Sequence, residues 1–274
     1  MAYFRIQLYV NALRRQASFE MLIPNDMHVE APVGEAIQPA KQLKTLFLLH
    51  GYTGCAGNWV PEELAARYGF AIVMPSVENS FYLDGISTGH QFQTFVGEEL
   101  VDYVRRTFGL ARSPADTYIM GMSMGGFGAL HTALAYPETF GKAAALSSAL
   151  IVHEIASMKP GESNPVANYA YYRECFGDLE HVEESDNNPE TLVKKLRAAG
   201  KKLPEIYMCC GTEDSLLAAN RDLRDDLLAN GADLTYEEGP GGHDWVFWDT
   251  YIRKILDWLP LGEAKAGVSS GNVL

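Results

Sequence analysis

Apolar residues recur along this chain in short runs that predict eight β-strands. The run at residues 44–49 is apolar almost throughout, which is typical of a central parallel strand covered on both faces. The alternation of apolar and polar positions at the N-terminus predicts a strand at residues 4–10, and a second follows at 17–23. Further strands are expected at residues 70–74, 115–120, 142–146, 205–210 and 233–237.

Helical patterns lie between these strands, at residues 58–68, 91–108, 127–135, 215–228 and 245–259. In the amphipathic segment 91–108, the expected core face consists of Phe95, Leu100, Val101 and Val104. The polar residues 25–42 are expected to form a loop. Strands that alternate with helices predict an α/β fold, with a central, mostly parallel sheet of about eight strands flanked by helices.

Residues 151–200 interrupt this rhythm with prolines, a tyrosine cluster and an acidic polar run. We interpret this segment as a small insertion over the sheet edge that forms part of a cap, rather than as a second domain. Residues 1–262 are therefore expected to form a single domain. The small, polar residues 263–274 are expected to be a disordered tail.

The turn G-M-S-M-G-G at residues 121–126 stands between a predicted strand and a predicted helix. A G-x-S-x-G in this setting is the nucleophile elbow of α/β-hydrolases. Small neighbours let the backbone close sharply, and the helix N-terminus favours negative charge beside the serine. The motif alone is common, and the alternative is a plain glycine-rich turn. Its setting makes Ser123 the candidate nucleophile and predicts the α/β-hydrolase fold.

The strand at 44–49 ends in H-G-Y-T-G, where hydrolases supply half of the oxyanion hole. The candidate oxyanion donors are the backbone N–H groups of Tyr52 and Met124. Two such groups stabilise a tetrahedral intermediate by roughly 3 kcal/mol each. The alternative is that His50 and Gly51 only turn the end of a strand. His50 itself is expected to be structural, hydrogen-bonded beneath the loop.

A nucleophilic serine needs a base, and the base needs a carboxylate that orients it. The chain order in this fold is serine, acid, histidine, and His243 follows the last predicted strand. Glu213 and Asp214 compete for the acid; position favours Asp214, which could also cap the following helix. Asp244 is too close in sequence to His243 to be its partner. Structural or surface roles are expected for the other histidines, His28, His90, His131, His153 and His181.

The loop after the strand at 70–74 leaves the carboxyl end of that strand, where open α/β sheets bind ligands. Its aromatic and polar residues, at 75–85, suit a substrate wall and equally suit a self-packed surface loop. The sequence leaves both interpretations open.

Composition and charge limit the partners. The 274 residues are 47% hydrophobic, which suits a packed core, and the net charge of −13 argues against nucleic acid and anionic membranes. No apolar run approaches the roughly 20 residues that span a bilayer, and the N-terminus lacks signal-peptide features, so a cytoplasmic location is expected.

The spacing of the cysteines indicates no metal site or disulfide framework, and buried free thiols are expected at Cys55, Cys175, Cys209 and Cys210.

The chain resembles the tributyrin esterase-like branch of the esterase D and S-formylglutathione hydrolase-like α/β-hydrolase family. Five motifs carry the resemblance: L-L-H-G-Y-T-G at 48–54, M-P-S-V-E-N-S-F-Y at 74–82, G-M-S-M-G-G-F-G-A at 121–129, G-T-E-D at 211–214 and G-H at 242–243. Their order and spacing hold over roughly residues 1–260. The resemblance implies a serine esterase for short acyl chains that needs no metal or cofactor. It also supports a triad of Ser123, Asp214 and His243, and implies a homodimer or tetramer.

These expectations define a reaction on a small-molecule ester. Ser123 attacks the carbonyl while His243 takes its proton, and water then releases the acyl group. The family resemblance favours acetyl esters of carbohydrates, with feruloyl esters or S-formylglutathione-type thioesters as alternatives. Acyl transfer to an alcohol stays open. A binding protein on an inactive hydrolase fold is the non-enzymatic alternative, and an intact Ser, Asp and His in the correct order argue against it.

Overall fold

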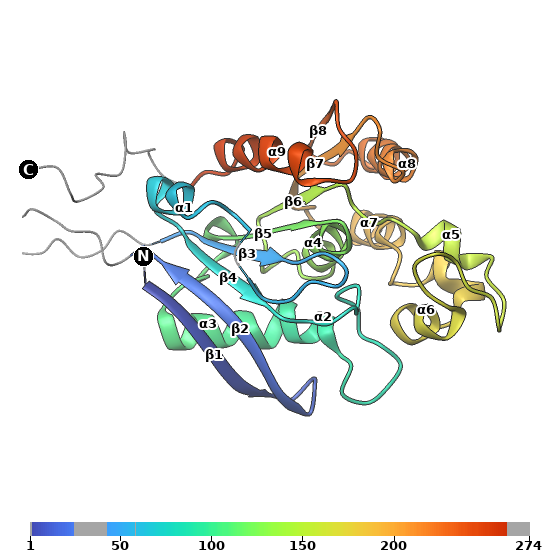
Figure 1. Ribbon diagram of the computed structural model, residues 1–274, viewed down its shortest axis with the longest axis horizontal. Helices are drawn as coiled ribbons and strands as arrows, with labels where there is room; N and C mark the ends of the chain where they lie inside the picture. The colour runs from blue at the N-terminus through green and yellow to red at the C-terminus, as the bar shows by residue number, and fades with distance from the viewer. Residues whose placement is uncertain (1, 25–42, 58, 262–274) are drawn as a thin grey trace, which may run out of the picture.

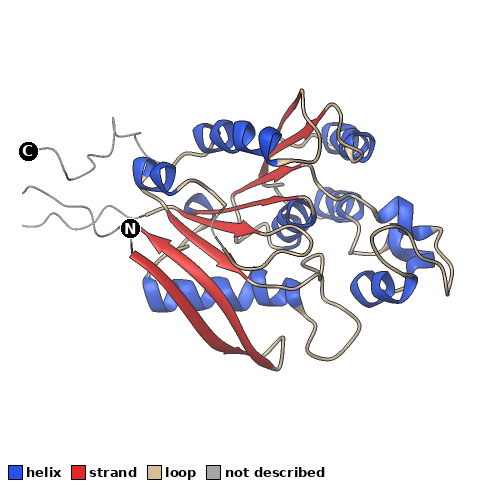
Figure 2. Ribbon diagram, viewed as in Figure 1, coloured by secondary structure: helices blue, strands red, loops and turns tan. Residues whose placement is uncertain are grey.

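The computed structural model describes residues 2–24, 43–57 and 59–261, which contain one eight-stranded sheet (Figures 1 and 2). The strands lie in the order β1-β2-β4-β3-β5-β6-β7-β8; β2 is antiparallel to β1 and β4, and the others pair in parallel. The prediction of a mostly parallel sheet of about eight strands is therefore confirmed. The bounds are β1 (Ala2–Val10), β2 (Arg15–Ile23), β3 (Thr45–Leu49), β4 (Ala71–Pro75), β5 (Thr117–Met122), β6 (Lys142–Leu146), β7 (Glu205–Gly211) and β8 (Leu234–Gly239).

Helices cover both faces of the sheet. On one face lie α1 (Glu62–Tyr68) and α9 (Trp245–Trp258); on the other lie α3 (Leu100–Phe108), α4 (Met124–Ala135) and α8 (Leu217–Ala229). Successive strand residues point to opposite faces. Leu46 and Leu48 of β3 pack towards α1 and α9, whereas Phe47 packs towards α3 and α4. This double burial explains why the central strands are apolar throughout.

Two predicted helices differ in detail. The first begins at Glu62 instead of residue 58, because Pro61 occupies its N-cap position with an extended ψ of 126°. The segment predicted at 91–108 is divided into α2 (Phe92–Thr94), a π-helical turn (Phe95–Glu99) and α3. The four residues expected on its core face are all buried, as predicted. The predicted loop at 25–42 and tail at 263–274 lie outside the described residues.

The insertion at residues 151–200 contains α5 (Val152–Ala156), α6 (Tyr169–Phe176), a 3-10 turn (Leu179–Glu184) and α7 (Pro189–Ala198). The edge strands of the sheet are β1 and β8, and Arg197 of α7 bonds to the carbonyls of Asn230 and Gly231, shortly before β8. The body of α7 packs against α4 and α8, and the Tyr171 hydroxyl of α6 reaches the carbonyl of Asn79 in the loop after β4. The insertion therefore stands beside the carboxyl ends of the central strands (Figure 1).

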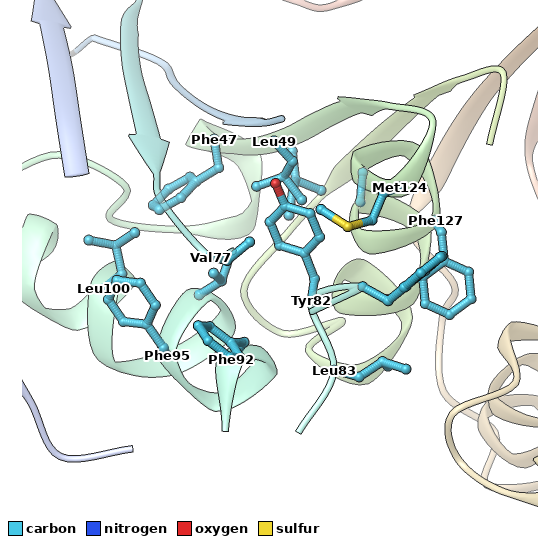
Figure 3. Packing of buried hydrophobic residues seen from close by; sticks show 14 of the residues in the cluster. Phe47, Leu49, Val77, Tyr82, Leu83, Phe92, Phe95, Leu100, Met124 and Phe127 are labelled. Atoms are coloured by element: carbon cyan, nitrogen blue, oxygen red, sulfur yellow. The ribbon is translucent and has the colours of Figure 1, made fainter. Parts of the chain in front are cut away.

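Tyr82 fastens the loop after β4 onto the centre of the molecule (Figure 3). Its buried ring lies over α4 at Gly128, where an added Cβ would come within 2.3 Å of the ring. Its hydroxyl donates to the carbonyl oxygen of His50 at 2.9 Å. The neighbouring ring of Phe81 packs edge-on against Phe127, with ring centroids 5.6 Å apart. The loops after β3 and β4 are thus held against the helix that follows Ser123.

Candidate active site

Ser123 lies in the sharp turn between β5 and α4, with φ 55° and ψ −120°. This left-handed conformation is strained for serine and persists only where the surroundings hold it. The Ser123 N–H donates to the carbonyl of Leu146 at 2.9 Å, and the Ser123 carbonyl accepts the N–H of Phe127 at 3.1 Å. The chain crosses itself closely here, since a Cβ on Gly121 would lie 2.0 Å from the carbonyl oxygen of Gly125. The elbow can therefore close only with glycine at position 121.

His243 connects Ser123 to Asp214 through both nitrogens of its ring. Ser123 Oγ lies 2.9 Å from Nε2, and Asp214 Oδ2 lies 2.9 Å from Nδ1. Because a carboxylate can only accept, Nδ1 carries the ring proton and donates it to Asp214. Nε2 is then left to accept the serine hydroxyl. The structure brings these three sequence-predicted residues together in a geometry that can move a proton from serine to imidazole.

The carboxylate of Asp214 is fully buried but well supplied with donors. Burial alone would raise its pKa, yet hydrogen bonds from His243, from the N–H of Leu216 at 2.9 Å and from the hydroxyl of Ser147 hold the pKa below its usual value. Ser147 in turn accepts the indole N–H of Trp248 at 3.1 Å. Ser147 and Trp248 are supporting residues that sequence reasoning missed. Their signal was weak, although Ser147 directly follows a strand that neighbours β7.

The other acids near His243 in sequence have different partners. The carboxylate of Glu213 accepts the N–H of Gly241 and so fastens the histidine loop to the acid loop. Asp244 is the N-cap of α9, where its Oδ1 accepts the N–H of Val246 at 2.9 Å. Neither acid bonds to the imidazole of His243 in the structure.

The loop after β3 brings Tyr52 beside the elbow. A Cβ built on Gly51 would lie 3.6 Å from Cβ of Ser123. Met124 is the first residue of α4, where N–H groups have no acceptor within the helix. Within the described part of the chain, neither the Tyr52 N–H nor the Met124 N–H donates to a protein acceptor. Both groups are therefore free to donate to a bound ligand.

His50 lies beneath this loop, as predicted from the sequence. Nδ1 is 2.8 Å from the carbonyl oxygen of Gly51, and Nε2 accepts the N–H of Val77 at 3.2 Å. An Nε2 that accepts must be unprotonated, so the ring is neutral and Nδ1 donates to Gly51. Burial lowers the pKa of His50, which favours this neutral form.

A cavity of about 340 Å³ opens beside Tyr52, between the loop after β4 and α6. That volume lies within the usual range of small-molecule pockets. Nδ1 of His90 lies 2.9 Å from Oε1 of Glu174, and Arg15 pairs with Glu78. The loop at 75–85 thus lines a cavity and also buries some of its own residues. The described lining residues are Tyr52, Glu78, Asn79, Ser80, Leu83, Gly85, His90, Phe92, Tyr171, Glu174 and Cys175.

The remaining predicted histidines have partners outside the triad geometry. His131 is buried and its Nε2 donates to the carbonyl of Asp186 at 2.7 Å. His153 lies between two glutamates of the insertion, and His181 is exposed beside Asp178. His28 lies outside the described residues.

The cysteines only partly match their prediction. Cys175, Cys209 and Cys210 are buried, but Cys55 is exposed, because it lies in the surface loop after β3. Over residues 2–24, 43–57 and 59–261, no cluster of three His, Cys, Asp or Glu side chains could hold a metal ion. Over the same ranges, no helix is long and apolar enough to cross a membrane.

Comparison with known proteins defines the class of this protein. A family model named Esterase matches residues 18–259, so the chain belongs to the esterase family. It is 40% identical over 263 residues to an acetyl esterase of Caldicellulosiruptor saccharolyticus, a match that covers 94% of this chain and 98% of the relative. The chain is accordingly a carboxylic ester hydrolase.

Two solved structures from Staphylococcus aureus share this fold. One is fluorophosphonate-binding serine hydrolase F, with 28% identity and a TM-score of 0.80. The other is an S-formylglutathione hydrolase, with 27% identity and a TM-score of 0.78. Each match covers 94% of this chain and 98% of the other chain. The family and the α/β-hydrolase fold expected from the sequence are confirmed.

Proposed function

We propose that this chain hydrolyses short-chain acyl esters, acetyl esters of carbohydrates among them, through Ser123, His243 and Asp214. The observation that carries the proposal is the bonding of His243 at both ring nitrogens, 2.9 Å from Ser123 Oγ and 2.9 Å from Asp214 Oδ2. The name of the 40% identical relative, an acetyl esterase, supports a short acyl group.

In the proposed reaction, Ser123 Oγ attacks the ester carbonyl while Nε2 of His243 takes its proton. The N–H groups of Tyr52 and Met124 bind the oxyanion. The alcohol leaves with the proton from Nε2, and an acyl group stays on Ser123. Water, deprotonated by His243, then releases the acid. Asp214 stays ionised throughout, holds the ring tautomer and stabilises the imidazolium.

The cavity beside Tyr52 supports a neutral, hydroxyl-rich alcohol as the leaving group. The two carboxylates of the described lining already have partners: Glu78 pairs with Arg15, and Glu174 is hydrogen-bonded to His90. Each carboxylate keeps lone pairs that can accept hydrogen bonds from the hydroxyl groups of a ligand. Aromatic side chains in the same wall offer apolar faces to a sugar ring.

A thioester of glutathione is the second candidate, favoured by the likeness to the S-formylglutathione hydrolase. The chemistry of the cavity opposes it. Glutathione carries two carboxylates, and the described lining contains no lysine or arginine that could pair with them. The lack of a cationic partner for these carboxylates in the described lining therefore ranks the carbohydrate ester first.

The test compares kcat/KM on acetylated xylo-oligosaccharides, p-nitrophenyl butyrate and S-formylglutathione, with Ser123→Ala as the blank. We expect the acetylated sugar to be preferred and Ser123→Ala to lower kcat by roughly 10⁴-fold or more. A fluorophosphonate should add mass at Ser123. Near-full activity of Ser123→Ala, or no adduct on the wild-type protein, would sink the assignment. Preference for the aryl butyrate would limit the function to general short-chain ester hydrolysis.

The single domain at residues 1–262, the homodimer or tetramer and the cytoplasmic location stay predictions. Light scattering coupled to size-exclusion chromatography measures the assembly directly.

A further inference from the structure

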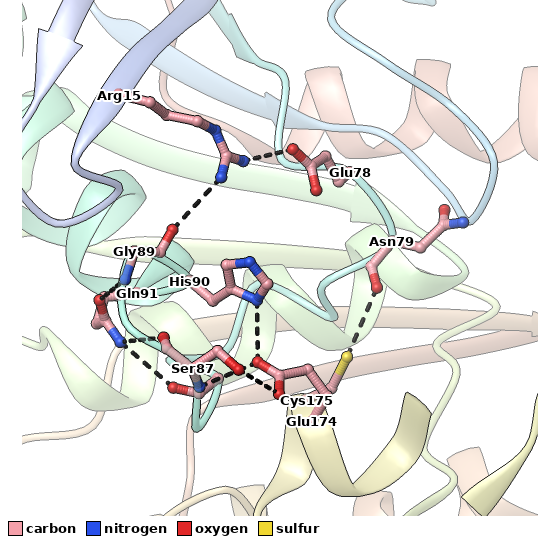
Figure 4. Close-up of polar contacts among 10 residues, drawn as sticks. Arg15, Glu78, Asn79, Ser87, Gly89, His90, Gln91, Glu174 and Cys175 are labelled. Carbon is pink, nitrogen blue, oxygen red and sulfur yellow. Dashed lines mark hydrogen bonds and ion pairs between the residues drawn. The ribbon is translucent and has the colours of Figure 1, made fainter. Parts of the chain in front are cut away.

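Asn79 joins the loop that carries Tyr52 to helix α6 of the insertion. Its side-chain Oδ1 accepts the N–H of Thr53 at 2.7 Å. Its backbone carbonyl accepts the hydroxyl of Tyr171 at 2.7 Å and the thiol of Cys175 at 3.6 Å. Figure 4 shows Asn79 with its carbonyl towards Cys175 and its side chain pointing away from that residue. One residue of the loop after β4 therefore connects two segments that are distant in sequence.

The bond to Thr53 holds a strained piece of backbone. Thr53 has φ 64°, a left-handed conformation that β-branched residues rarely adopt. Such a conformation persists only where neighbouring groups hold it. The Thr53 N–H belongs to the peptide unit that begins with the carbonyl of Tyr52. Without an acceptor at Asn79 Oδ1, Thr53 can relax towards an extended conformation, and that rotation changes the orientation of Tyr52.

The same residues also form one wall of the cavity. Tyr52, Asn79, Tyr171 and Cys175 all line it. The rings of Tyr52 and Tyr171 meet edge-on, with centroids 6.0 Å apart. A group bound in the cavity thus touches the residues that fix the backbone beside Ser123.

We propose that Asn79 is a positioning residue that sets the direction of the Tyr52 N–H and links it to α6 and the cavity. This rests on the proposed function, in which that N–H binds the oxyanion. Asn79 touches no reacting atom and acts through Thr53. Because the N–H is needed most when negative charge develops, loss of its support lowers kcat and leaves KM nearly unchanged.

The first test replaces the acceptor. Asn79→Leu is expected to lower kcat on p-nitrophenyl acetate about 10- to 100-fold. This decrease should not exceed the one caused by removing an oxyanion donor altogether. Asn79→Asp keeps an oxygen of the same reach and should recover most of that loss. The matched control is Asn164→Leu, since the half-buried Asn164 also accepts backbone N–H groups through Oδ1, but within the insertion. Rates are expressed per active site, counted by the mass of the fluorophosphonate adduct at completion.

The second test separates positioning from a general structural role. A trifluoromethyl ketone forms an oxyanion on the serine, so its affinity should fall in Asn79→Leu by the same factor as kcat. Tyr171→Phe removes the donor to the Asn79 carbonyl and keeps the ring, and should lower kcat about two- to five-fold. Tyr172→Phe is its control, because that hydroxyl donates to Asn164 instead.

The outcomes are distinct. Equal kcat values for Asn79→Leu and Asn164→Leu, or for Asn79→Leu and Asn79→Asp, overturn the proposal. If Asn79→Leu does not fold, the comparison of Tyr171→Phe with Tyr172→Phe decides, and equal rates overturn it. Failure of the proposed function would appear differently, as a wild-type protein that gains no adduct at Ser123.

Discussion

Nδ1 of His50 donates to the carbonyl oxygen of Gly51, 2.8 Å away. That carbonyl shares a planar peptide unit with the N–H of Tyr52, and in a trans peptide the two groups point in opposite directions. The bond from His50 therefore acts together with the bond between Asn79 and Thr53 to hold the direction of the candidate oxyanion donor. The other ring nitrogen accepts the N–H of Val77 at 3.2 Å and ties the loop after β3 to the loop after β4.

Two substitutions of His50 separate these bonds. His50→Asn places an amide nitrogen near the position of Nδ1 and can keep the bond to Gly51, whereas His50→Gln reaches the position of Nε2 and can keep the bond to Val77. We expect His50→Gln to lower kcat roughly 10- to 100-fold, with a smaller loss in His50→Asn. Each variant leaves one buried group unpaired, which costs about 1–3 kcal/mol of stability. Steady-state kinetics and urea unfolding measure the two effects, and a greater kcat loss in His50→Asn would contradict the argument.

Asp214 and Glu213 should differ sharply on substitution. Asp214→Asn places an amide where Nδ1 of His243 needs an acceptor, so it favours the wrong ring tautomer and is expected to lower kcat roughly 10⁴-fold. Glu213→Gln only weakens a contact to the backbone of Gly241, and its effect should stay within about 10-fold. Parallel kcat measurements near neutral pH test this. The reverse ranking would move the orienting acid to Glu213.

The residues that could be predicted from sequence are those whose position follows from chain order. Ser123, Asp214 and His243 each follow a predicted strand of a parallel sheet, so the period of apolar residues and one turn motif were enough to single them out. The hydrogen bond between Asp214 and His243 also distinguishes Asp214 from the adjacent Glu213, whereas sequence position could only rank these two acids.

Residues whose role depends on packing between distant loops escaped prediction. Ser147 supports Asp214 only because β6 and β7 are neighbours, and Asn79 bonds to Thr53 and Tyr171 only because three loops meet. The exact contacts of the insertion escaped prediction for the same reason. Periodicity does not tell which surface a set of short helices covers. Here the insertion is held by α7 on α4, by the bond from Tyr171 to Asn79, and by Phe176, which packs against Phe81 and Phe127.

His131 should make the stability of the fold depend on pH. Burial lowers its pKa from 6.5 to about 4, its Nε2 donates to the carbonyl of Asp186, and its Nδ1 is buried without a partner. The unfolded chain therefore binds more protons than the folded one between pH 6.5 and 4. Stability is complete above the unfolded pKa and falls as the pH drops through this window. Between pH 7.5 and 5 this residue alone should cost about 2 kcal/mol.

Urea unfolding of the wild type and of His131→Gln at both pH values isolates this contribution. Glutamine can still donate to Asp186 but does not titrate, so the loss of stability at pH 5 should be smaller by about 2 kcal/mol in the variant. His181→Gln is the matched control, because His181 is exposed. A wild-type slope that His131→Gln leaves unchanged would show that other groups cause the acid sensitivity.

Gly128 should be intolerant of even a single methyl group. A Cβ there would lie 2.3 Å from Cδ2 of Tyr82, a fully buried ring whose hydroxyl donates to the carbonyl of His50 at 2.9 Å. Alanine normally stabilises a helix relative to glycine by up to about 1 kcal/mol, but here overpacking costs about 1–3 kcal/mol and should prevail. Gly128→Ala is therefore expected to lower the free energy of unfolding and, by displacing Tyr82 from His50, to lower kcat as well. Gly57→Ala is the control, since the nearest atom to its Cβ is 4.0 Å away and its effect should stay within about 0.5 kcal/mol. A Gly128→Ala protein as stable and active as Gly57→Ala would mean that Tyr82 can move without disturbing the loop after β3.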